Sequence, residues 1–167
     1  DSSAMALTSG TVSFWIKTAD LSFSNTPGNG GVGLLSRDSR NFDGGGHLTI
    51  WVEADGSVEV RHQSTSQSYT LRSASGLIRE NTWHLITYSF GNSRMRLFID
   101  GQLIANNTQY AGGISGNNEP LILGATASVS GDGESTPSQL RDFFKGDFDD
   151  IRLYRNELAL ADVEDLY

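Results

Sequence analysis

Hydrophobic and polar residues alternate with a period of two over much of the chain. In the stretch after Gly10, the side chains of Val12, Phe14 and Ile16 fall on one face of an extended backbone, and polar or aromatic side chains fall on the other. Such alternation predicts β-strands with one buried face. A second short strand is expected at 32–35, between long loops rich in Gly, Ser and Asn.

The pattern between residues 47 and 63 predicts a β-hairpin with a defined register. A three-residue loop with Gly56 in the left-handed conformation pairs Val52 with Val58 and keeps the apolar residues on one face. A two-residue loop would set Val52 against Glu59 and split that face. We therefore expect the three-residue loop. It gathers the following residues on the polar face: His47, Thr49, Trp51, Glu59, Arg61 and Gln63.

A second hairpin is expected over residues 83–100, with its loop at 91–94. Pairing Phe90 with Met95 leaves apolar residues on both faces of this hairpin. Two apolar faces are typical of strands in the middle of a sheet, so we expect this hairpin to be central.

The rest of the chain adds short strands at 120–124, where we expect burial, and at 148–154, together with one helical signal. Leu160, Val163 and Leu166 recur at helical spacing over two turns. Many short strands, frequent turn residues and one terminal helix predict an all-β fold. The expected architecture is an antiparallel β-sandwich with a short C-terminal helix.

Composition supports a folded domain and excludes several kinds of chemistry. The chain has 167 residues, of which 37% are hydrophobic, 19 are Gly and 3 are Pro, and it has no Cys. This length suits one domain with a sizeable core. The absence of Cys excludes disulfides, thiolate catalysis and Cys-ligated zinc.

The charge balance narrows the expected partners. With 20 acidic and 12 basic residues, the net charge is −8. Nucleic acid is therefore not expected as a partner, because phosphate binding needs a basic surface. No apolar run approaches the roughly 18 residues that span a bilayer, so membrane insertion is not expected either. An acidic chain suits a divalent cation.

Four sequence blocks resemble those of the laminin G-like, or concanavalin A-like, jelly roll. In chain order they are 11–17, 82–86, 95–101 and 144–154. Their order and spacing match the family across nearly the whole chain, so the resemblance implies one jelly-roll domain over residues 1–167. The middle of the chain resembles a subgroup found in large secreted bacterial proteins. These include calcium-dependent adhesins of the repeats-in-toxin type and polysaccharide-active proteins.

The chain departs from the family pattern at both ends. Family members usually carry another strand before the block at Thr11, and that strand pairs beside the last strand. Either residues 1–8 supply a shortened version, or the strand is missing because the chain is part of a split domain. Near the C-terminus, Ala159 stands where similar sequences carry Ser or Thr. Loss of that N-cap costs about 1 kcal/mol, so we expect the helix to fray.

The fold alone does not fix a function. Members of this family bind carbohydrates or proteins, hydrolyse glycans, or space other domains. The resemblance leads us to expect a non-catalytic extracellular or cell-surface module that binds a glycan. We expect it to act as a monomer beside neighbouring domains of the same polypeptide. The alternatives are a structural spacer and a glycan-active enzyme, either a hydrolase or a lyase.

The polar face of the first hairpin is the candidate ligand site. Sugar sites combine an aromatic platform with planar polar side chains that reach hydroxyl groups. Trp51 and Tyr69 could serve as platforms. Arg61, Gln63 and His47 could donate and accept hydrogen bonds. The alternative is an ordinary polar sheet face.

Other aromatic and histidine residues are expected to have structural roles. Trp15 and Trp83 lie in blocks that the whole family shares, which favours positions in the core. His62 and His84 have no carboxylate partner that the sequence reveals. We expect both to be structural histidines with satisfied hydrogen bonds.

Two groups of oxygen-bearing residues could hold Ca²⁺, which takes roughly six to eight oxygen ligands. Related jelly rolls often hold a structural Ca²⁺ near the last-strand Asp that corresponds to Asp149 or Asp150 here. Asp147 points the same way as Asp149 on an extended strand. The second group lies in one loop and consists of Asp38, Asn41 and Asp43. The alternative is a set of solvated carboxylates.

Catalytic motifs are missing from the sequence. Glycanases on this fold carry their acid and nucleophile on one strand as Glu-x-Asp-x-x-Glu, and no such run occurs here. The nearest run, Asp147 to Asp150, has no glutamate. Motifs of serine hydrolases, phosphate loops and zinc peptidases are also absent. We therefore do not expect an enzyme.

Overall fold

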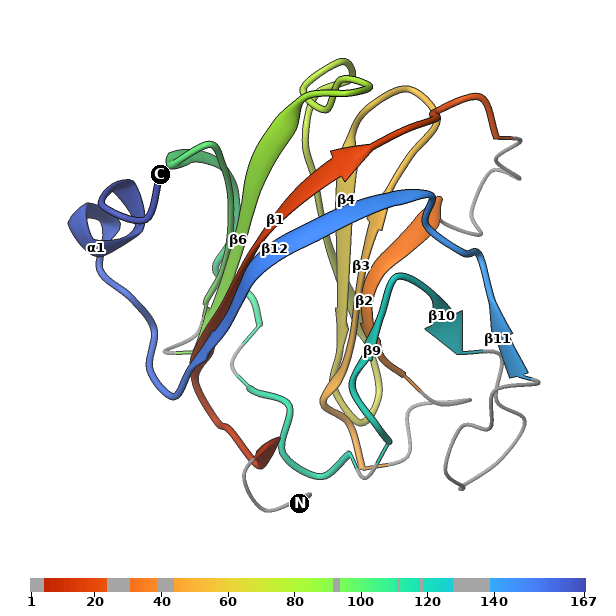
Figure 1. Cartoon of the computed structure of the whole chain (residues 1–167). Coiled ribbons are helices and arrows are strands. Elements are labelled where there is room, and N and C mark those ends of the chain that lie inside the picture. The colour runs from red at the N-terminus through yellow and green to blue at the C-terminus, as the bar shows by residue number, and fades with distance from the viewer. Residues whose placement is uncertain are drawn as a thin grey trace.

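The computed structural model describes residues 5–23, 31–38, 44–91, 94–110, 112–117, 119–127 and 139–167. In this part of the chain, two large antiparallel sheets stack face to face (Figure 1). The prediction of an all-β sandwich with a short C-terminal helix is confirmed.

The first sheet, which we call the back sheet, has the spatial order β12-β1-β6-β7-β8. Its strands are β1 (Gly10–Thr18), β6 (Trp83–Gly91), β7 (Arg94–Ile99), β8 (Gln102–Asn107) and β12 (Gly146–Tyr154). Helix α1 (Leu160–Glu164) follows β12 and covers part of the outer side of this sheet (Figure 1).

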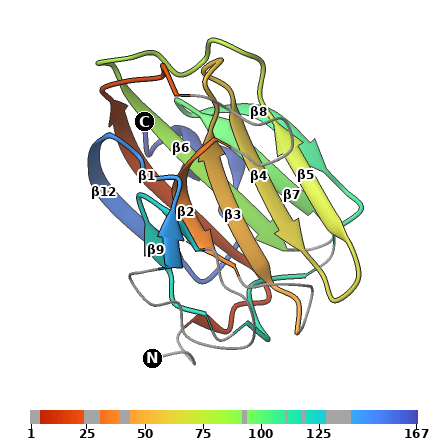
Figure 2. The same cartoon turned by 90° about the vertical axis from the view of Figure 1, so that its right-hand side faces the viewer.

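The second sheet, which we call the front sheet, faces the viewer in Figure 2 and has the order β5-β4-β3-β2-β9. Its strands are β2 (Val32–Arg37), β3 (His47–Val52), β4 (Val58–Gln63), β5 (Ser68–Arg72) and β9 (Ile122–Leu123). A small pair, β10 (Thr126–Ala127) and β11 (Leu140–Arg141), lies outside this sheet near β2.

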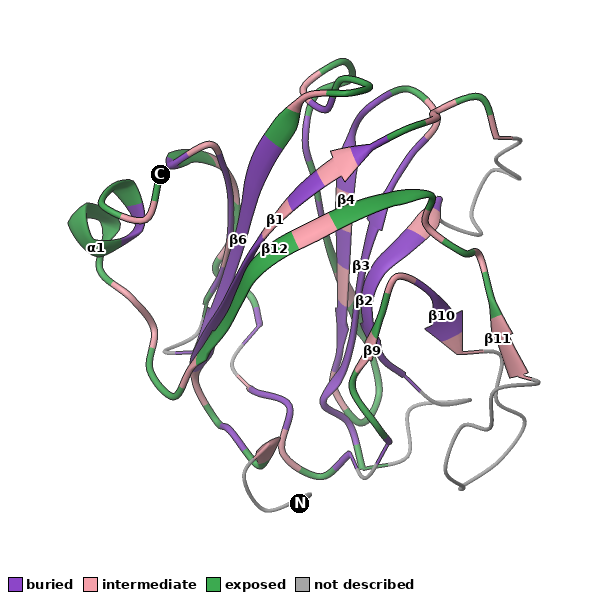
Figure 3. Cartoon of the chain, in the orientation of Figure 1, coloured by how far each residue is buried: buried purple, intermediate pink, exposed green. Residues whose placement is uncertain are grey.

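The core lies between the two sheets. Inward residues such as Phe14, Ile50 and Ile86 are 0% exposed, and Figure 3 shows burial concentrated on the strands inside the sandwich. Removing such apolar surface from water contributes about 25 cal/mol per Å². β12 is exposed along most of its length, because it forms the edge of the back sheet.

The first hairpin has the predicted register. Val52 pairs with Val58 and Thr49 pairs with Arg61, so the three-residue loop is confirmed. Gly56 has a φ of +73°, and a Cβ added there would lie 2.5 Å from the carbonyl oxygen of Ile78. A side chain at this position would therefore be strained and would clash.

The second hairpin is central, as predicted: Phe90 pairs with Met95, and β6 and β7 both have neighbours on each side. Asp100 and Gly101 form the next tight turn with φ values of 52° and 76°. Asp100 also accepts hydrogen bonds from the Leu85 N–H and pairs with His84 Nδ1 at 2.8 Å. The sequence did not reveal this carboxylate partner of His84.

Three strand predictions need correction. The strand expected at 120–124 is reduced to β9, and Leu121 and Leu123 are exposed, because β9 is the edge of the front sheet. No strand was expected over residues 102–107, which form β8. The alternation did not identify β5, in which Leu71 is the buried residue.

The two ends of the chain differ in how they pack. In the described residues no strand pairs with the outer side of β12. Leu7 is buried, and its carbonyl accepts the N–H of Ile114 at 2.8 Å, so residues 5–8 pack at the end of the sandwich. At the helix, Ala159 makes no side-chain cap, but its N–H donates to Asp162 Oδ2 at 3.2 Å.

His62 is a fully buried histidine inside the sandwich. Its Nδ1 lies 2.7 Å from the Tyr88 hydroxyl and its Nε2 lies 3.1 Å from the Gly113 carbonyl. Because a carbonyl only accepts, Nε2 carries the proton and Nδ1 accepts from Tyr88. Burial lowers the pKa of His62 to about 3, against a smaller opposing effect of the Gly113 hydrogen bond.

This lowered pKa makes the stability of the domain depend on pH. Between about pH 6.5 and 3 the unfolded state binds a proton at His62 and the folded state does not, so acid lowers the free energy of unfolding. We expect His62→Gln to reduce the slope of that free energy against pH between 6 and 4 by about 1.4 kcal/mol per pH unit. Urea unfolding at several pH values measures the slope, and an unchanged slope would contradict the assignment.

Candidate functional site

Polar side chains gather on the outer face of the front sheet, where the sequence predicted a ligand site. The register pairs Ser36 of β2 with Thr49 of β3, and Thr49 with Arg61 of β4. Asp38 follows β2 and reaches the same face. We call the following set the front polar cluster: Ser36, Asp38, His47, Thr49, Trp51 and Arg61.

Asp38 is the centre of this cluster. It accepts a hydrogen bond from Thr49 Oγ1 at 3.0 Å and a second from Arg61 Nη2. Its Oδ1 lies 3.3 Å from His47 Nδ1, a contact that does not have hydrogen-bond geometry. The structure therefore brings the expected calcium ligand Asp38 together with expected sugar ligands.

The neighbours of Asp38 stabilise its ionised form. Burial alone raises the pKa of this carboxyl, but His47, the Arg61 guanidinium and Thr49 together lower it below its ordinary value. The carboxylate is thus ionised and paired with Arg61, and the Asp38–Arg61 pair carries no net charge. Such a pair needs good geometry to offset the desolvation of both groups.

Trp51 is in the cluster but is not an exposed platform. It is 5% exposed, and the Arg61 guanidinium carbon lies 4.9 Å from the centroid of its ring. Gly33 pairs with Trp51, and the chain at Ala125 and Thr126 crosses so close to Gly33 that a Cβ there would clash. The prediction of a stacking surface at Trp51 is wrong, because this crossing and Arg61 enclose the indole.

Of the two further predicted ligand residues, Gln63 lies on the predicted face and Tyr69 does not. Gln63 lies on the outer face opposite His47, and its Nε2 donates to Ser68 Oγ at 3.0 Å. Tyr69 pairs with His62, so its ring points to the inner face and packs against Tyr110 with centroids 5.1 Å apart. Tyr69 is therefore not part of the site, because one residue along a strand changes the face.

Among the described residues, several buried polar atoms of the cluster have no hydrogen-bond partner. They include Ser36 Oγ, Trp51 Nε1, Arg61 Nε and Asp38 Oδ1. A buried polar group without a partner costs about 1–3 kcal/mol, so such groups are uncommon in folded proteins. Two of these atoms can only donate and the serine hydroxyl can do both. Their shared location marks this face as the candidate ligand site.

Trp15 and Trp83 are not core residues, which corrects the prediction made for them. Both lie on the outer face of the back sheet, and Trp83 is 38% exposed. They line a pocket together with Asp149, Asp150 and Arg152. The sequence blocks placed Trp15 and Trp83 on strands, but the alternation alone did not indicate which outer face carries a pocket.

The expected calcium ligands are only partly described. Asn41 and Asp43 lie outside the described residues. Asp147 pairs with Lys17 Nζ at 2.8 Å, and Asp150 pairs with Arg152. Within the described ranges, no three His, Cys, Asp or Glu side chains gather as a metal site. Calcium therefore stays a prediction.

The surroundings of Glu53, at the first hairpin, raise the pKa of its carboxyl group. Glu53 follows β3 and is 5% exposed. Burial, and then the charge of Glu59, raise its pKa. Neither residue lines the pocket beside Trp15 and Trp83.

Comparison with known proteins identifies the relatives of this chain. A family model described as the concanavalin A-like lectin/glucanases superfamily matches residues 1–164. No curated protein matches the sequence. No helix among the described residues has the length and apolar character needed to cross a membrane.

Solved structures share the fold at low sequence identity. The carbohydrate-binding module CBM40 of the Ruminococcus gnavus IT-sialidase, bound to α2,3-sialyllactose, is 20% identical, with a TM-score of 0.72 over 99% of this chain and 85% of that one. Domain 4 of the extracellular arabinanase AbnA from Geobacillus stearothermophilus, in complex with arabinotriose, is 21% identical, with a TM-score of 0.66 over 96% and 67%. A SAP-like pentraxin from Limulus polyphemus is 14% identical, with a TM-score of 0.61 over 95% and 70%.

The Asp38–Arg61 pair should be more strongly coupled than an exposed pair, because the Asp38 side chain is only 12% exposed. In a double-mutant cycle with Asp38→Asn and Arg61→Met, urea unfolding should give a coupling free energy of about 1–3 kcal/mol. The exposed pair Arg72–Asp55, at the end of the same sheet, is the control and should give less than about 1 kcal/mol. Equal coupling in the two cycles would contradict a buried, interlocked cluster.

Proposed function

The chain belongs to the concanavalin A-like lectin/glucanases superfamily, and on this premise we propose that it is a non-catalytic carbohydrate-binding module. The front polar cluster is the binding site in this proposal. The observation that carries it is a group of buried donors and acceptors on one outer sheet face that have no partner among the described residues. The glycan ligands bound to two proteins of the same fold support the choice of ligand class.

Hydrogen bonding, rather than stacking, is the main interaction of the proposed site. Trp51 is enclosed, so it holds the Arg61 guanidinium and offers its Nε1–H. Arg61 is the open side of the cluster, because 35% of its side chain is exposed and Thr70 beside it is exposed too. A sugar would approach over Arg61, and its hydroxyl groups would accept from the Arg61 guanidinium. To bond to the Trp51 Nε1–H and the Ser36 hydroxyl, the ligand would have to displace the groups that bury these two atoms.

The pairing of Arg61 favours neutral sugars. Asp38 already compensates the guanidinium, so the site has no spare positive charge for a carboxylate on the ligand. Hydroxyl groups can donate and accept, which suits a set of unpartnered donors beside a serine. The proposed ligand is therefore a neutral glycan presented outside the cell, with the module acting beside other domains of its polypeptide.

A glycan array with the isolated chain, followed by calorimetry on the best ligand, tests this function. We expect Trp51→Phe, which keeps the ring and removes the Nε1–H, to weaken binding about fivefold to tenfold. Arg61→Met should abolish detectable binding. Arg72→Met changes an exposed arginine on the same sheet and should leave the affinity within about twofold.

Each result of this experiment bears on the proposal. Binding that survives in both Trp51→Phe and Arg61→Met would move the site elsewhere on the domain. No ligand in any glycan class would favour a structural spacer. Release of products from a polysaccharide panel would indicate an enzyme.

Calcium is a second, separate part of the proposal. Asp38, which belongs to the front polar cluster, would supply oxygen ligands to Ca²⁺ together with Asn41 and Asp43. We expect millimolar Ca²⁺ to raise the melting temperature by several degrees and EDTA to reverse the rise. The reason is that a bound ion stabilises the folded state by RT ln(1 + [L]/Kd), which is roughly 2.7 kcal/mol at a hundredfold excess of the ion over Kd. Asp43→Asn should remove the effect. A melting temperature that does not respond to Ca²⁺ or EDTA would contradict a calcium site.

A further inference from the structure

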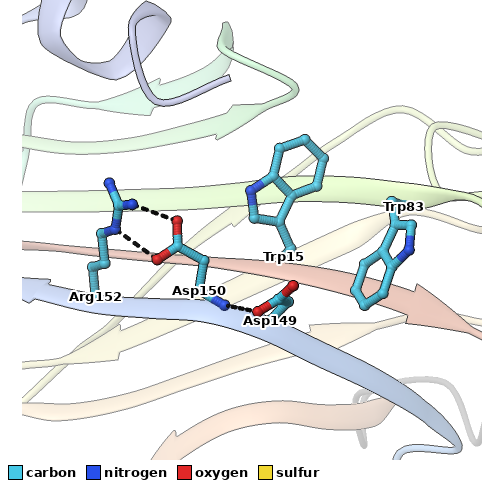
Figure 4. Close-up of a pocket in the computed structure, with 5 residues that line it drawn as sticks. All are labelled: Trp15, Trp83, Asp149, Asp150 and Arg152. Carbon is cyan, nitrogen blue, oxygen red and sulfur yellow. Dashed lines mark hydrogen bonds and ion pairs between the residues drawn. The ribbon is translucent and has the colours of Figure 1, made fainter.

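A second candidate site lies on the opposite side of the sandwich from the front polar cluster. It is an open pocket of about 670 Å³ lined by Trp15, Trp83, Asp149, Asp150 and Arg152, which we call the tryptophan cleft (Figure 4). The two indoles stand on the same side of the back sheet with the carboxylates beside them (Figure 4). The proposed glycan site uses none of these residues.

A β-bulge places two consecutive carboxylates in the cleft. The register pairs Trp15 with Asp149 and then shifts before Ser13 pairs with Arg152. In a regular strand Asp149 and Asp150 would point to opposite faces. Asp150 has a φ of 46°, and this left-handed residue turns its side chain to the same pocket. A residue other than Gly in this conformation costs about 1 kcal/mol or more.

Of the three aspartates around the tryptophan cleft, two form ion pairs and Asp149 does not pair with any described cation. Asp150 accepts from Arg152 Nε at 2.8 Å and pairs with Arg152 Nη2 at 2.6 Å. Asp147 pairs with Lys17. Asp149 accepts only the backbone N–H of Asp150, at 2.8 Å, and no cation of the described chain pairs with it. A negative charge without a counter-ion therefore lies beside two indole rings.

The indoles already show what kind of group they attract. Lys17 Nζ lies 4.9 Å from the centroid of the Trp83 ring, within the range of a cation–π interaction. Trp15 stacks on Tyr167 with centroids 5.7 Å apart and an interplanar angle of 23°, which fixes the orientation of its ring. The net charge of −8 on the whole chain adds a field that favours cations.

We propose that the tryptophan cleft binds the ammonium group of a small organic cation. The ammonium lies against the indoles of Trp15 and Trp83 and pairs with the Asp149 carboxylate. A neutral or anionic ligand of the same size lacks both interactions. The cleft is thus a second ligand site, and it holds whether or not the front polar cluster binds a glycan.

The three tryptophans of the chain allow a test with an internal control. Tetramethylammonium is titrated into the whole chain at constant ionic strength, and NMR follows the three indole N–H resonances, assigned with single Trp→Phe variants. The resonances of Trp15 and Trp83 should shift with a millimolar Kd, and that of the enclosed Trp51 should not. The uncharged analogue tert-butanol, of nearly the same shape, should bind at least about fivefold more weakly.

Two matched variants separate the pairing with Asp149 from a general effect of charge. Asp149→Asn keeps an oxygen for the Asp150 N–H and removes the charge, and it should weaken tetramethylammonium binding about fivefold. Asp147→Asn removes the same charge two residues away, where Lys17 already compensates it, and should change the affinity by less than about twofold. Unchanged melting temperatures confirm that both variants fold.

The proposal is overturned by any of three results. Equal affinities for tetramethylammonium and tert-butanol would indicate only an apolar pocket. Equal effects of Asp149→Asn and Asp147→Asn would indicate only the overall negative field. The absence of shifts at Trp15 and Trp83 would show that the cleft does not bind an ammonium group.

Discussion

The register of the antiparallel strands is the constraint on which the rest of this structure depends. Each strand has one face buried against the other sheet, and a shift by one residue would expose that face and bury its polar partner. Phe14, Ile50 and Ile86 are fully buried at the centre of this arrangement. The outer faces are fixed as a consequence, so the core determines which side chains can meet a ligand.

This constraint explains how much of the fold and the site could be predicted. The turn at Gly56 and the apolar residues beside it specify the first hairpin, and the same register brings Thr49 next to Arg61. Local pattern could not show that the chain near Thr126 crosses over Gly33, more than ninety positions earlier in the sequence, and encloses Trp51. Tyr69 was misplaced because β5 was not predicted; in β5, Tyr69 shares the inner face with Leu71.

Charged groups are paired differently on the outer faces of the front and back sheets. In the front polar cluster, Asp38 and Arg61 compensate one another inside a buried network, which leaves unpartnered donors but no net charge. On the back sheet the ion pairs are local and more exposed, and within the described ranges they leave Asp149 without a counter-ion. A ligand on the front sheet would therefore be held mainly by hydrogen bonds, and a ligand on the back sheet mainly by electrostatic and aromatic interactions. Two ligands bound to opposite faces would not compete for the same surface.

The bulge at Asp150 connects this chemistry with the edge of the sheet. In the described chain β12 is an edge strand, and a regular edge strand offers unpaired backbone groups to another molecule. A bulge interrupts that pattern, and charged residues along the strand disfavour edge-to-edge pairing. Asp147, Asp149 and Asp150 supply the charge, and the left-handed Asp150 supplies the interruption. The bulge thus both interrupts the edge and directs two carboxylates toward the tryptophans, so a regular strand at this position would lose the cleft and keep only the charges as protection.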